Sequence, residues 1–495
     1  MSDRSEQLLC LSYYFSTDRI LLYTKFLSKL SEFCAPRVWS FAVKEKNFPV
    51  HNENSKHFEL IQGEDKIPHW LNLARHFSDY VWDNKLISSS RESMWRLRRA
   101  GSTKSHERLL WNAARLGNGI TRSANLDKWV EGRMLKYGYC PRSLGTFQAN
   151  RPTAVLAMVP FTPLHMSIVA SARKLQIPTI AYITSWDNLT TKGRLTFDYD
   201  GYLVWSETMK QELLAFHPQS RNKPILIVGA PQYDMFINEA FFESKEDFIE
   251  RHGLDKNKKI ILYCLGSPNF IREDYGAASF LNLLRAELPT NIQVIVRLHP
   301  GFYEDDYQIV PEIRRRYRDV VVQGNRQYFD KHPLQTDASV VEWVNTFRHA
   351  DVVINLASTV TVDAAIFDKP IININFDPQP SEPDAQLIRE INSRWNHFRP
   401  VAESGGVWNV RSSEELCEAM RTYLEQPELH RQGRQSIVEH VCGNVDGRAG
   451  EKMAVGIQEI LSFARRSNGP KSGYEPALVG GKTFDRSRDG RITAD

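Results

Sequence analysis

The sequence lacks the features that mark secreted, membrane-spanning or metal-stapled proteins. Six cysteines occur in 495 residues, at Cys10, Cys34, Cys140, Cys264, Cys417 and Cys442. No two have the paired spacing of a zinc site or a disulfide framework, so we expect buried thiols in a reducing compartment. The first residues lack the basic-then-apolar order of a signal peptide, and no apolar run approaches the roughly 18 residues of a membrane span. We therefore expect a cytoplasmic protein.

A strong charge of one sign and the common nucleotide-binding fingerprints are also missing. The net charge of +4 is small for the length and gives no reason to expect nucleic acid as a partner. No G-x-G-x-x-G and no Walker A lysine loop is present, so dinucleotide oxidoreductases and P-loop NTPases lose their main support. What is present, 42% hydrophobic and 25% charged residues, is the composition of a globular protein with a substantial core. The length indicates two large domains.

Short apolar runs rich in β-branched residues alternate with helical stretches along most of the chain. This pattern is typical of buried parallel strands in βαβ units. Strands are expected at residues 8–14, 38–43, 154–159, 178–183, 201–205 and 225–228, and again at 260–265, 293–298, 320–322, 352–354 and 371–374. The sequence thus predicts an α/β fold, with two Rossmann-like, doubly wound parallel-sheet domains facing a cleft.

The boundary between the two domains is expected at a turn-rich break, Gly229-Ala230-Pro231. We assign residues 1–228 to an N-terminal acceptor domain and 229–466 to a C-terminal domain that binds a nucleotide donor. Residues 467–495 are rich in Gly, Arg and Ser and lack periodicity, so we expect a disordered tail there.

Residues 91–142 form a basic insertion in the first domain. They hold twelve Lys or Arg against four acids, a net charge of +8, with Trp95, Trp111 and Trp129 interleaved. Such a surface is suited to anionic lipid head groups or to a phosphorylated acceptor. The alternative is a solvated insertion whose tryptophans pack on the domain.

Ligands bind beyond the carboxyl ends of strands in open α/β sheets, so residues that follow predicted strands are the first candidates for a site. Arg297 and His299 come at the end of strand 293–298, and such a pair can hold a diphosphate. Alternatively, His299 only caps the turn that follows. Ser358 and Thr359 stand where a helix begins, with Ser358 as its expected N-cap. Hydroxyls and unpaired backbone N–H groups would bind a phosphate there without a metal, although an ordinary capped helix uses the same residues.

Two further clusters follow predicted strands. Gly266 and Ser267 come after the first strand of the second domain, where glycine allows close approach of the backbone to a ligand. In the first domain, strand 178–183 is followed by residues 184–193 (TSWDNLTTKG), a concentration of polar side chains. Asp187 is the candidate general base, which would take the proton of an acceptor hydroxyl as that oxygen attacks the donor. Three neighbours are expected to line the cleft or contact the acceptor: Trp186, Asn188 and Lys192.

One tempting motif is set aside. Asp198-Tyr199-Asp200 has the form of the metal-binding DxD of other transferases, but it precedes a predicted strand rather than following one. We therefore expect no metal and no cofactor, with a nucleotide-diphosphate sugar as substrate.

Three motifs of the second half occur in a set order. They are residues 297–300 (RLHP), residues 355–363 (NLASTVTVD) followed by Asp368-Lys369-Pro370, and residues 446–449 (DGRA). The set resembles the R-x-H-P, phosphate-binding helix and D-G-x-A of the GT-B superfamily, especially the CDP-glycerol glycerophosphotransferases and bacterial capsule and surface-polysaccharide enzymes. The resemblance spans about residues 258–464.

The chain also departs from that family. Asn355 stands where Asp or Thr-Asp is usual, and Asp368 replaces the usual Gly before Lys369. Related polyol-phosphate transferases carry a catalytic His in a Trp-His-Gly-Thr stretch, where this chain has Trp186-Asp187-Asn188. An Asp base suits attack on a sugar anomeric carbon, which favours inverting glycosyl transfer.

The resemblance and the strand-end residues together predict a metal-independent glycosyltransferase. It would move a sugar from a nucleotide-diphosphate donor to a surface-polysaccharide, glycoconjugate or lipid-linked acceptor, at the inner face of the membrane. Asp187 and His299 would be catalytic, and the donor would be bound by Arg297, Ser358, Thr359, Gly266 and Ser267. The alternatives are a CDP-polyol phosphotransferase, a nucleotide-sugar epimerase of the same fold, or a non-catalytic carbohydrate-binding scaffold.

Overall fold

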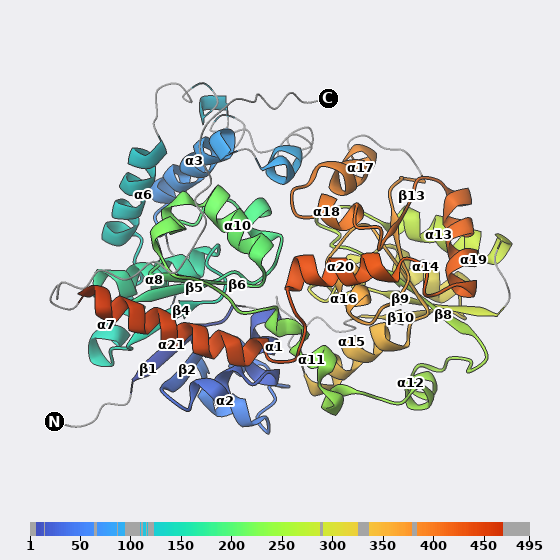
Figure 1. Cartoon of the computed structure of the whole chain (residues 1–495), viewed down its shortest axis with the longest axis horizontal. Helices are drawn as coiled ribbons and strands as arrows, with labels where there is room; N and C mark the ends of the chain where they lie inside the picture. Colours follow the sequence, from blue (N-terminus) through green and yellow to red (C-terminus); the bar gives the residue numbers. More distant parts are fainter. Residues whose placement is uncertain are drawn as a thin grey trace, which may run out of the picture.

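The structure, a computed structural model, consists of two parallel β-sheets, each layered with helices (Figure 1). It describes residues 6–468 except for 14, 64–66, 87, 95–108, 110–111, 115, 117–122, 288–290, 325–335 and 379–383. The tail predicted for residues 467–495 lies outside the described residues from 469 on, while 467 and 468 belong to the last helix. Much of the basic insertion also lies outside the described residues.

The first sheet has seven strands in the order β3-β2-β1-β4-β5-β6-β7, all parallel. The strands are β1 (Gln7–Leu11), β2 (Ala35–Ser40), β3 (Phe58–Leu60), β4 (Ala154–Ala157), β5 (Thr179–Tyr182), β6 (Gly201–Val204) and β7 (Ile225–Ile227). The helices of this part are α1 (Phe15–Tyr23), α2 (Phe26–Leu30), α3 (His69–Leu86), α6 (Ser123–Tyr137), α7 (Pro141–Ala149), α8 (Pro163–Lys174), α9 (Asn188–Thr191) and α10 (Glu207–Phe216). The strand order reverses between β1 and β4, which marks a ligand-binding edge in such sheets.

The second sheet has six parallel strands in the order β10-β9-β8-β11-β12-β13. They are β8 (Lys259–Cys264), β9 (Ile292–Arg297), β10 (Val321–Gln323), β11 (Val352–Asn355), β12 (Ile371–Ile374) and β13 (Trp408–Val410). Its helices are α11 (Asp234–Ile237), α12 (Lys245–His252), α13 (Asp274–Glu287), α14 (Ile309–Arg316), α15 (Asp337–His349), α16 (Val360–Ile366), α17 (Asp384–Arg394), α18 (Arg399–Ala402), α19 (Ser413–Glu425) and α20 (Arg431–Cys442). The order reverses between β8 and β11.

Short 3₁₀ turns complete the chain. They are Ala42–Lys44, Glu53–His57, Pro218–Asn222, Pro231–Tyr233, Glu239–Phe241 and Glu304–Asp306. The prediction of two doubly wound parallel sheets is confirmed. Strands β3 and β13 were not predicted, because each has only three residues and lacks an apolar run.

The last helix, α21 (Ala449–Asn468), returns to the first sheet and packs on α2 and β6 (Figure 1). Two glycines make this close approach possible, since a Cβ on Gly201 would lie 2.5 Å from Ile460 and one on Gly456 3.1 Å from Leu203. Asp234 fixes the start of the helix by accepting the N–H groups of Ala449 (3.0 Å) and Gly450 (2.7 Å). The prediction that residues up to 466 belong wholly to the second domain is therefore wrong for this helix.

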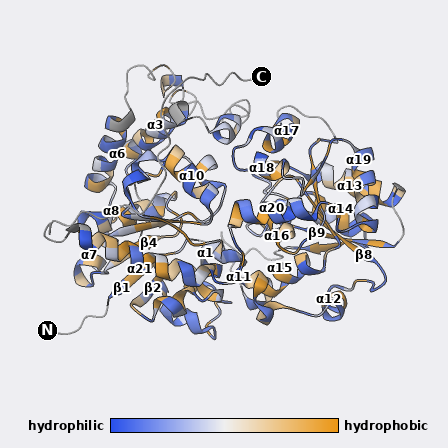
Figure 2. Cartoon of the chain, viewed as in Figure 1, coloured by the Kyte–Doolittle hydropathy of each residue, from blue (hydrophilic) through white to orange (hydrophobic). Residues whose placement is uncertain are grey.

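The apolar strands lie at the centre of each unit and the hydrophilic helix faces lie outside (Figure 2). Burial of both faces of a sheet explains why these strands appear in the sequence as continuous apolar runs rather than alternating ones. Among the described residues, no helix is long and apolar enough to cross a membrane.

Candidate active site

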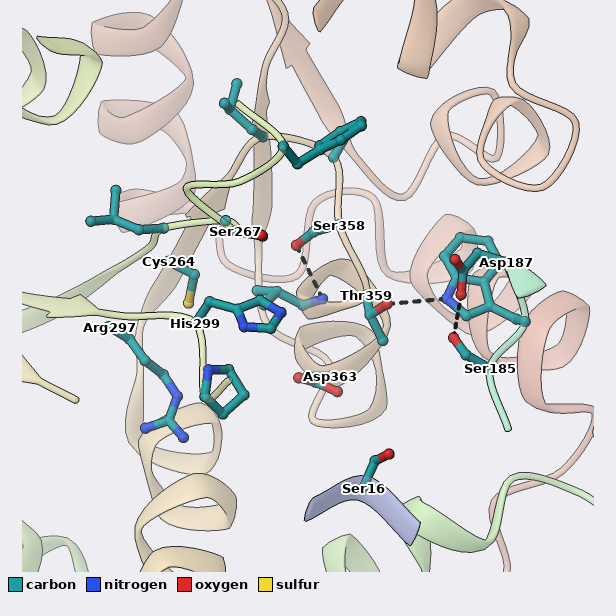
Figure 3. A pocket seen from close by; sticks show the side chains of 18 of the residues that line it. Ser16, Ser185, Asp187, Cys264, Ser267, Arg297, His299, Ser358, Thr359 and Asp363 are labelled. Carbon is teal, nitrogen blue, oxygen red and sulfur yellow. Dashed lines mark hydrogen bonds between the residues drawn. The ribbon is translucent and has the colours of Figure 1, made fainter. Parts of the chain in front are cut away.

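A cavity of about 860 Å³ lies between the two sheets, at the loops that follow β5, β8, β9 and β11. All ten residues that the sequence places in the site line it: Trp186, Asp187, Asn188, Lys192, Gly266, Ser267, Arg297, His299, Ser358 and Thr359. Strand-end reasoning therefore located one shared cavity, while the chemical role of each residue stays a prediction. Figure 3 shows several of these side chains converging from both sheets.

His299 is held so that one ring nitrogen is a hydrogen-bond donor. Its Nδ1 accepts the N–H of Gly301 (3.0 Å), which places the ring proton on Nε2 in the neutral form. Burial lowers the pKa of His299 to about 4, so the ring is neutral at pH 7. Its backbone N–H donates to the Tyr307 hydroxyl (3.1 Å), which itself donates to the carbonyl of Gly266 (2.9 Å). Tyr307 thus ties the loops after β8 and β9 together, and Nε2–H of His299 can donate to a phosphate oxygen.

The turn from β11 into α16 presents two hydroxyls to the cavity. The predicted N-cap at Ser358 is wrong by one residue, because Thr359 occupies that position and makes no side-chain capping bond. The Ser358 hydroxyl instead accepts the N–H of Val360 (3.3 Å). Ala357 before it has φ of +55°, a left-handed conformation that costs a non-glycine residue free energy. Such strain is typical of a turn that is shaped to aim side chains at a ligand.

Asn355 explains one departure from the family pattern. Its Oδ1 accepts the N–H of Ser358 (2.9 Å), and its Nδ2 donates to Asn373 Oδ1 (3.0 Å) on the neighbouring strand. The residue is fully buried. An Asp at this position would bury a charge and lose the donor to Asn373, so an amide suits this sheet better.

Asp368 explains the other departure. It has φ of +53° at the end of α16, where glycine is otherwise favoured, and its carboxylate binds Arg434 (2.8 Å) and Arg431 (2.6 Å). Arg434 has no exposed surface. The ion pair between the Asp368 carboxylate and the buried Arg434 therefore offsets the free-energy cost of the positive φ at Asp368.

Arg297 lines the cavity but is already partnered. Its guanidinium donates to Gln323 Oε1 (3.1 Å) and lies 3.5 Å from Glu342. In Figure 3 its side chain points away from Ser358. A ligand would therefore have to share Arg297 with Glu342, which differs from the free diphosphate contact that the sequence predicts.

The carboxylate of Asp187 is largely enclosed by the protein, but several neighbouring side chains donate hydrogen bonds to it. It accepts the hydroxyls of Ser185 and Thr191 (2.9 Å) and the amide of Asn188 (3.2 Å). Burial acts to raise its pKa, but Lys192, His397 and these hydroxyls outweigh it, so the pKa of Asp187 is lowered. Asp187 is therefore ionised at pH 7 and a weak base on its own.

His397 is a site residue that the sequence analysis missed. It lies between α17 and α18 of the second unit, packs against the Trp186 ring (centroids 5.0 Å apart) and lines the cavity. Its Nδ1 is 2.9 Å from Thr190 Oγ1 and 3.4 Å from Ser90 Oγ, and the Thr190 hydroxyl also lies 3.1 Å from the carbonyl of Asp187. When Thr190 donates its proton to that carbonyl, Nδ1 of His397 donates to Thr190 and Nε2 keeps its lone pair. Burial lowers the pKa of His397 to about 4, while Asp187 acts to raise it.

The two units also touch directly at the cavity. Trp186 Nε1 donates to Thr359 Oγ1 (3.4 Å), and Ser89 of the first unit binds Asn396 of the second through its N–H (2.7 Å). The Trp186–Thr359 contact places the loop that carries Asp187 beside the turn that carries Ser358 (Figure 3).

The Asp198-Tyr199-Asp200 motif lies at the opposite end of the sheet. Asp200 accepts the N–H of Thr179 (2.8 Å) at the start of β5, and Asp198 pairs with Lys223 (3.5 Å). No group of three or more His, Cys, Asp or Glu that could hold a metal occurs among the described residues.

Glu273 is a buried carboxyl on the wall of the cavity. Its Oε1 accepts the N–H of Gly266 (2.8 Å), whereas Oε2 is buried without a partner. Burial raises the pKa of Glu273 from 4.5 to about 8, since the Gly266 bond offsets only part of the desolvation. The folded protein then keeps this proton between pH 4.5 and 8, where the unfolded chain has lost it.

We expect Glu273→Gln to gain stability relative to the parent as the pH rises from 4.5 to 8. Between pH 4.5 and 8 the free energy of unfolding of the parent falls by about 1.4 kcal/mol per pH unit. The amide of the variant has no proton to lose, so its stability lacks this dependence. Thermal unfolding from pH 4.5 to 8.5 measures the difference, with the exposed Glu418→Gln as control. A difference between variant and parent that does not change with pH would contradict the assignment.

The fold and the position of the cavity define the GT-B class, two Rossmann-like units with a ligand site between the carboxyl ends of their sheets. A family described as CDP-Glycerol:Poly(glycerophosphate) glycerophosphotransferase has a model that matches residues 184–459. The match covers more than half of the chain, which therefore belongs to this transferase family. The resemblance inferred from the three motifs is confirmed.

Solved structures with a similar fold include UDP-N-acetylglucosamine 2-epimerases. MnaA from S. aureus, in a co-structure with UDP, has a TM-score of 0.53 at 11% identity, covering 92% of this chain and 97% of that chain. A putative UDP-N-acetylglucosamine 2-epimerase from Listeria monocytogenes has a TM-score of 0.51 at 11% identity, covering 93% and 97%. UDP-GlcNAc 2-epimerase from Neisseria meningitidis, bound to UDP-GlcNAc, has 0.50 at 11%, covering 92% and 100%. At such identity the likeness shows the fold alone. No curated protein matches the chain.

Proposed function

We propose that this protein transfers a phosphate-linked group from a nucleotide-diphosphate donor to a hydroxyl of a carbohydrate or lipid-linked acceptor. The observation that carries the proposal is the single cavity in which His299 and Ser358 face Asp187 and His397. The donor diphosphate would accept hydrogen bonds from His299 Nε2–H and the Ser358 and Thr359 hydroxyls. The acceptor would enter on the side of Trp186, Asn188 and Lys192.

The base in this proposal is the Asp187 and His397 pair. His397 Nε2 takes the acceptor proton, and the nearby Asp187 carboxylate stabilises the imidazolium that forms. The histidine comes from the second unit, although the loop that carries Asp187 belongs to the first. Contact between the units thereby assembles the base.

Family membership favours a polyol phosphate as the transferred group. The acceptor oxygen would attack the β-phosphorus, the bond from that phosphorus to the bridging oxygen would break, and a nucleoside monophosphate would leave. The presence of His397 beside Asp187 supplies the imidazole that the Trp186-Asp187-Asn188 stretch lacks.

Transfer of a sugar is the second candidate, and the ionised Asp187 favours it. In that reaction the acceptor oxygen attacks the anomeric carbon, and a nucleoside diphosphate leaves with the electrons of the broken carbon–oxygen bond. Inversion at that carbon and independence from metal belong to this proposal.

The nucleotide released separates these reactions. Incubation with CDP-glycerol and an acceptor should yield CMP if polyol phosphate is moved, whereas UDP- or GDP-sugars with an acceptor should yield the diphosphate if a sugar is moved. Interconversion of UDP-sugars without an acceptor would identify an epimerase. A protein that binds an acceptor but leaves every donor intact would contradict the proposal and indicate a non-catalytic scaffold.

Association with an anionic membrane is proposed for α6 and its surroundings. The exposed face of α6 carries Lys128, Trp129, Lys136 and Tyr137, and Trp70 of α3 packs on Tyr137 (centroids 5.7 Å apart). Exposed aromatic rings beside cations suit a lipid interface. Part of the basic insertion has another role, because Arg91 is buried and binds Asp83 (2.6 Å). Trp95 and Trp111 lie outside the described residues.

We expect the protein to float with anionic vesicles at low salt and less at high salt, because screening weakens attraction between exposed charges. Trp129→Ala together with Lys136→Glu should reduce recovery, whereas Lys46→Glu, an exposed lysine of another region, should not. Equal recovery with neutral and anionic vesicles at every salt concentration would contradict the proposal.

A further inference from the structure

Arg19 is a buried cation for which the described part of the chain supplies no hydrogen-bonding partner. It lies on α1, directly after β1 of the first sheet, and only 6% of it is exposed. Among the residues that the structure describes, none forms a hydrogen bond or ion pair with its guanidinium, and its Nε is fully enclosed. The guanidinium lies over the Trp343 ring of the second unit, 3.6 Å from the guanidinium carbon to the ring centre. Both residues line the cavity.

Ser16 stands one helical turn before Arg19, on the same face of α1. Its Oγ is also buried without a partner, and it lines the same cavity. In Figure 3, Ser16 points toward the side of the cavity that carries Asp363. Unused donors of two different side chains therefore converge on one part of the cavity wall.

Such an arrangement is costly unless a ligand completes it. The enclosed Nε–H of Arg19 has no partner among the described residues, and burying an unpaired donor of a charged group costs free energy. Burial lowers the pKa of Arg19 to about 10, which still leaves it charged at pH 7. Asp363 is the nearby acid, but its Oδ2 accepts Trp343 Nε1 (3.3 Å) and no ion pair with Arg19 forms. Glu342 is taken by Arg297.

We propose that Ser16 and Arg19 form a second phosphate-binding arm, supplied by the first sheet, which faces the His299 and Ser358 side of the cavity. The planar guanidinium fork matches two oxygens of one phosphate, and the Trp343 face holds the fork in place. This inference rests on the proposed function. A phosphate held by Ser16 and Arg19 would let one ligand contact both units. That phosphate comes either from the donor diphosphate or from the end of a phosphorylated acceptor.

Isothermal titration with inorganic pyrophosphate and with glycerol 3-phosphate tests the arm on the full chain. Arg19→Lys keeps the charge and the aliphatic stem on Trp343 but loses the fork, so we expect affinity to fall about 10-fold or more. Ser16→Ala should cause a smaller loss. Arg221→Lys, at an exposed arginine of the first unit, should bind as the parent does.

The two probes identify the source of the phosphate. A loss confined to pyrophosphate assigns the arm to the donor, and a loss confined to glycerol 3-phosphate assigns it to the acceptor. Unchanged affinity for both probes in a folded Arg19→Lys, or no binding of either by the parent, overturns the inference. If Asp363 is the true partner, Asp363→Asn will lower thermal stability while Arg19→Lys leaves both affinities unchanged, which also overturns it.

Failure of this inference is distinct from failure of the proposed function. Arg19-dependent binding of pyrophosphate in a protein that turns over no donor would retain the arm and contradict the function. Turnover of a donor, together with unchanged phosphate affinities in Arg19→Lys, would support the proposed function and contradict the phosphate-binding role of Arg19.

Discussion

Replacing His397 by Gln or Asp187 by Asn should each lower the transfer rate by ~100 to 10,000-fold, the usual effect of losing a general base. Nucleotide affinity should stay nearly intact, because both side chains lie on the side of the cavity that we propose for the acceptor. The two residues act on one proton, so the double variant should be no slower than the slower single variant. Steady-state kinetics with titrated nucleotide binding gives the comparison.

The pH dependence sharpens this expectation. The pKa of His397 is lowered to about 4, so its imidazole is neutral and able to accept a proton above that pH. Activity should therefore fall only as the pH drops toward 4, not at the ordinary histidine value. In Asp187→Asn the imidazole loses a stabilising anion, and the residual activity should persist to lower pH. Turnover within a few-fold of the parent in either single variant would place the base elsewhere; Asp200, at the opposite end of the sheet, and Glu207, which does not line the cavity, are not candidates.

Replacing His299 or Ser358 by Ala should each weaken binding of a nucleoside diphosphate by about 10-fold or more, since a hydrogen bond to a charged group is worth roughly 1.5 to 3 kcal/mol. Affinity for the nucleoside alone should change little. Isothermal titration of both variants with nucleoside and diphosphate measures this, and Ser393→Ala, an exposed serine of α17, is the matched control.

The outcomes of this titration are distinct. Unchanged diphosphate affinity in a folded variant would mean that the phosphate lies elsewhere in the cavity. A parallel loss for nucleoside and diphosphate would contradict a contact confined to the phosphate, because the nucleoside has none.

The strands that carry the cavity could be predicted because they are buried on both faces. Continuous apolar runs such as Ile260–Ile261-Leu262 in β8 are distinctive in sequence, and the residues after them gather at one edge of a parallel sheet. That regularity placed Asp187, His299 and Ser358 in a common cavity. The edge strands β3 (FEL) and β13 (WNV) lack an apolar run and carry no such signal, whereas the equally short β7 (ILI) has one and was predicted.

The missing parts of the site depend on tertiary contacts. His397 follows no strand, and contacts of the segment between α17 and α18 with the first unit bring it to Trp186. Arg19 lies in α1, of which residues 17–23 are all buried, and its guanidinium is covered by Trp343 of the other unit. Likewise, the return of α21 to the first sheet depends on small residues at Gly201 and Gly456, which sequence periodicity does not distinguish.

The most direct test of the account is a crystal structure of the protein with CDP. We predict that the diphosphate lies in the cavity between the two sheets, with phosphate oxygens within hydrogen-bond distance of His299 Nε2 and Ser358 Oγ. A nucleotide bound outside this cavity, or with its diphosphate directed away from both residues, would contradict the account.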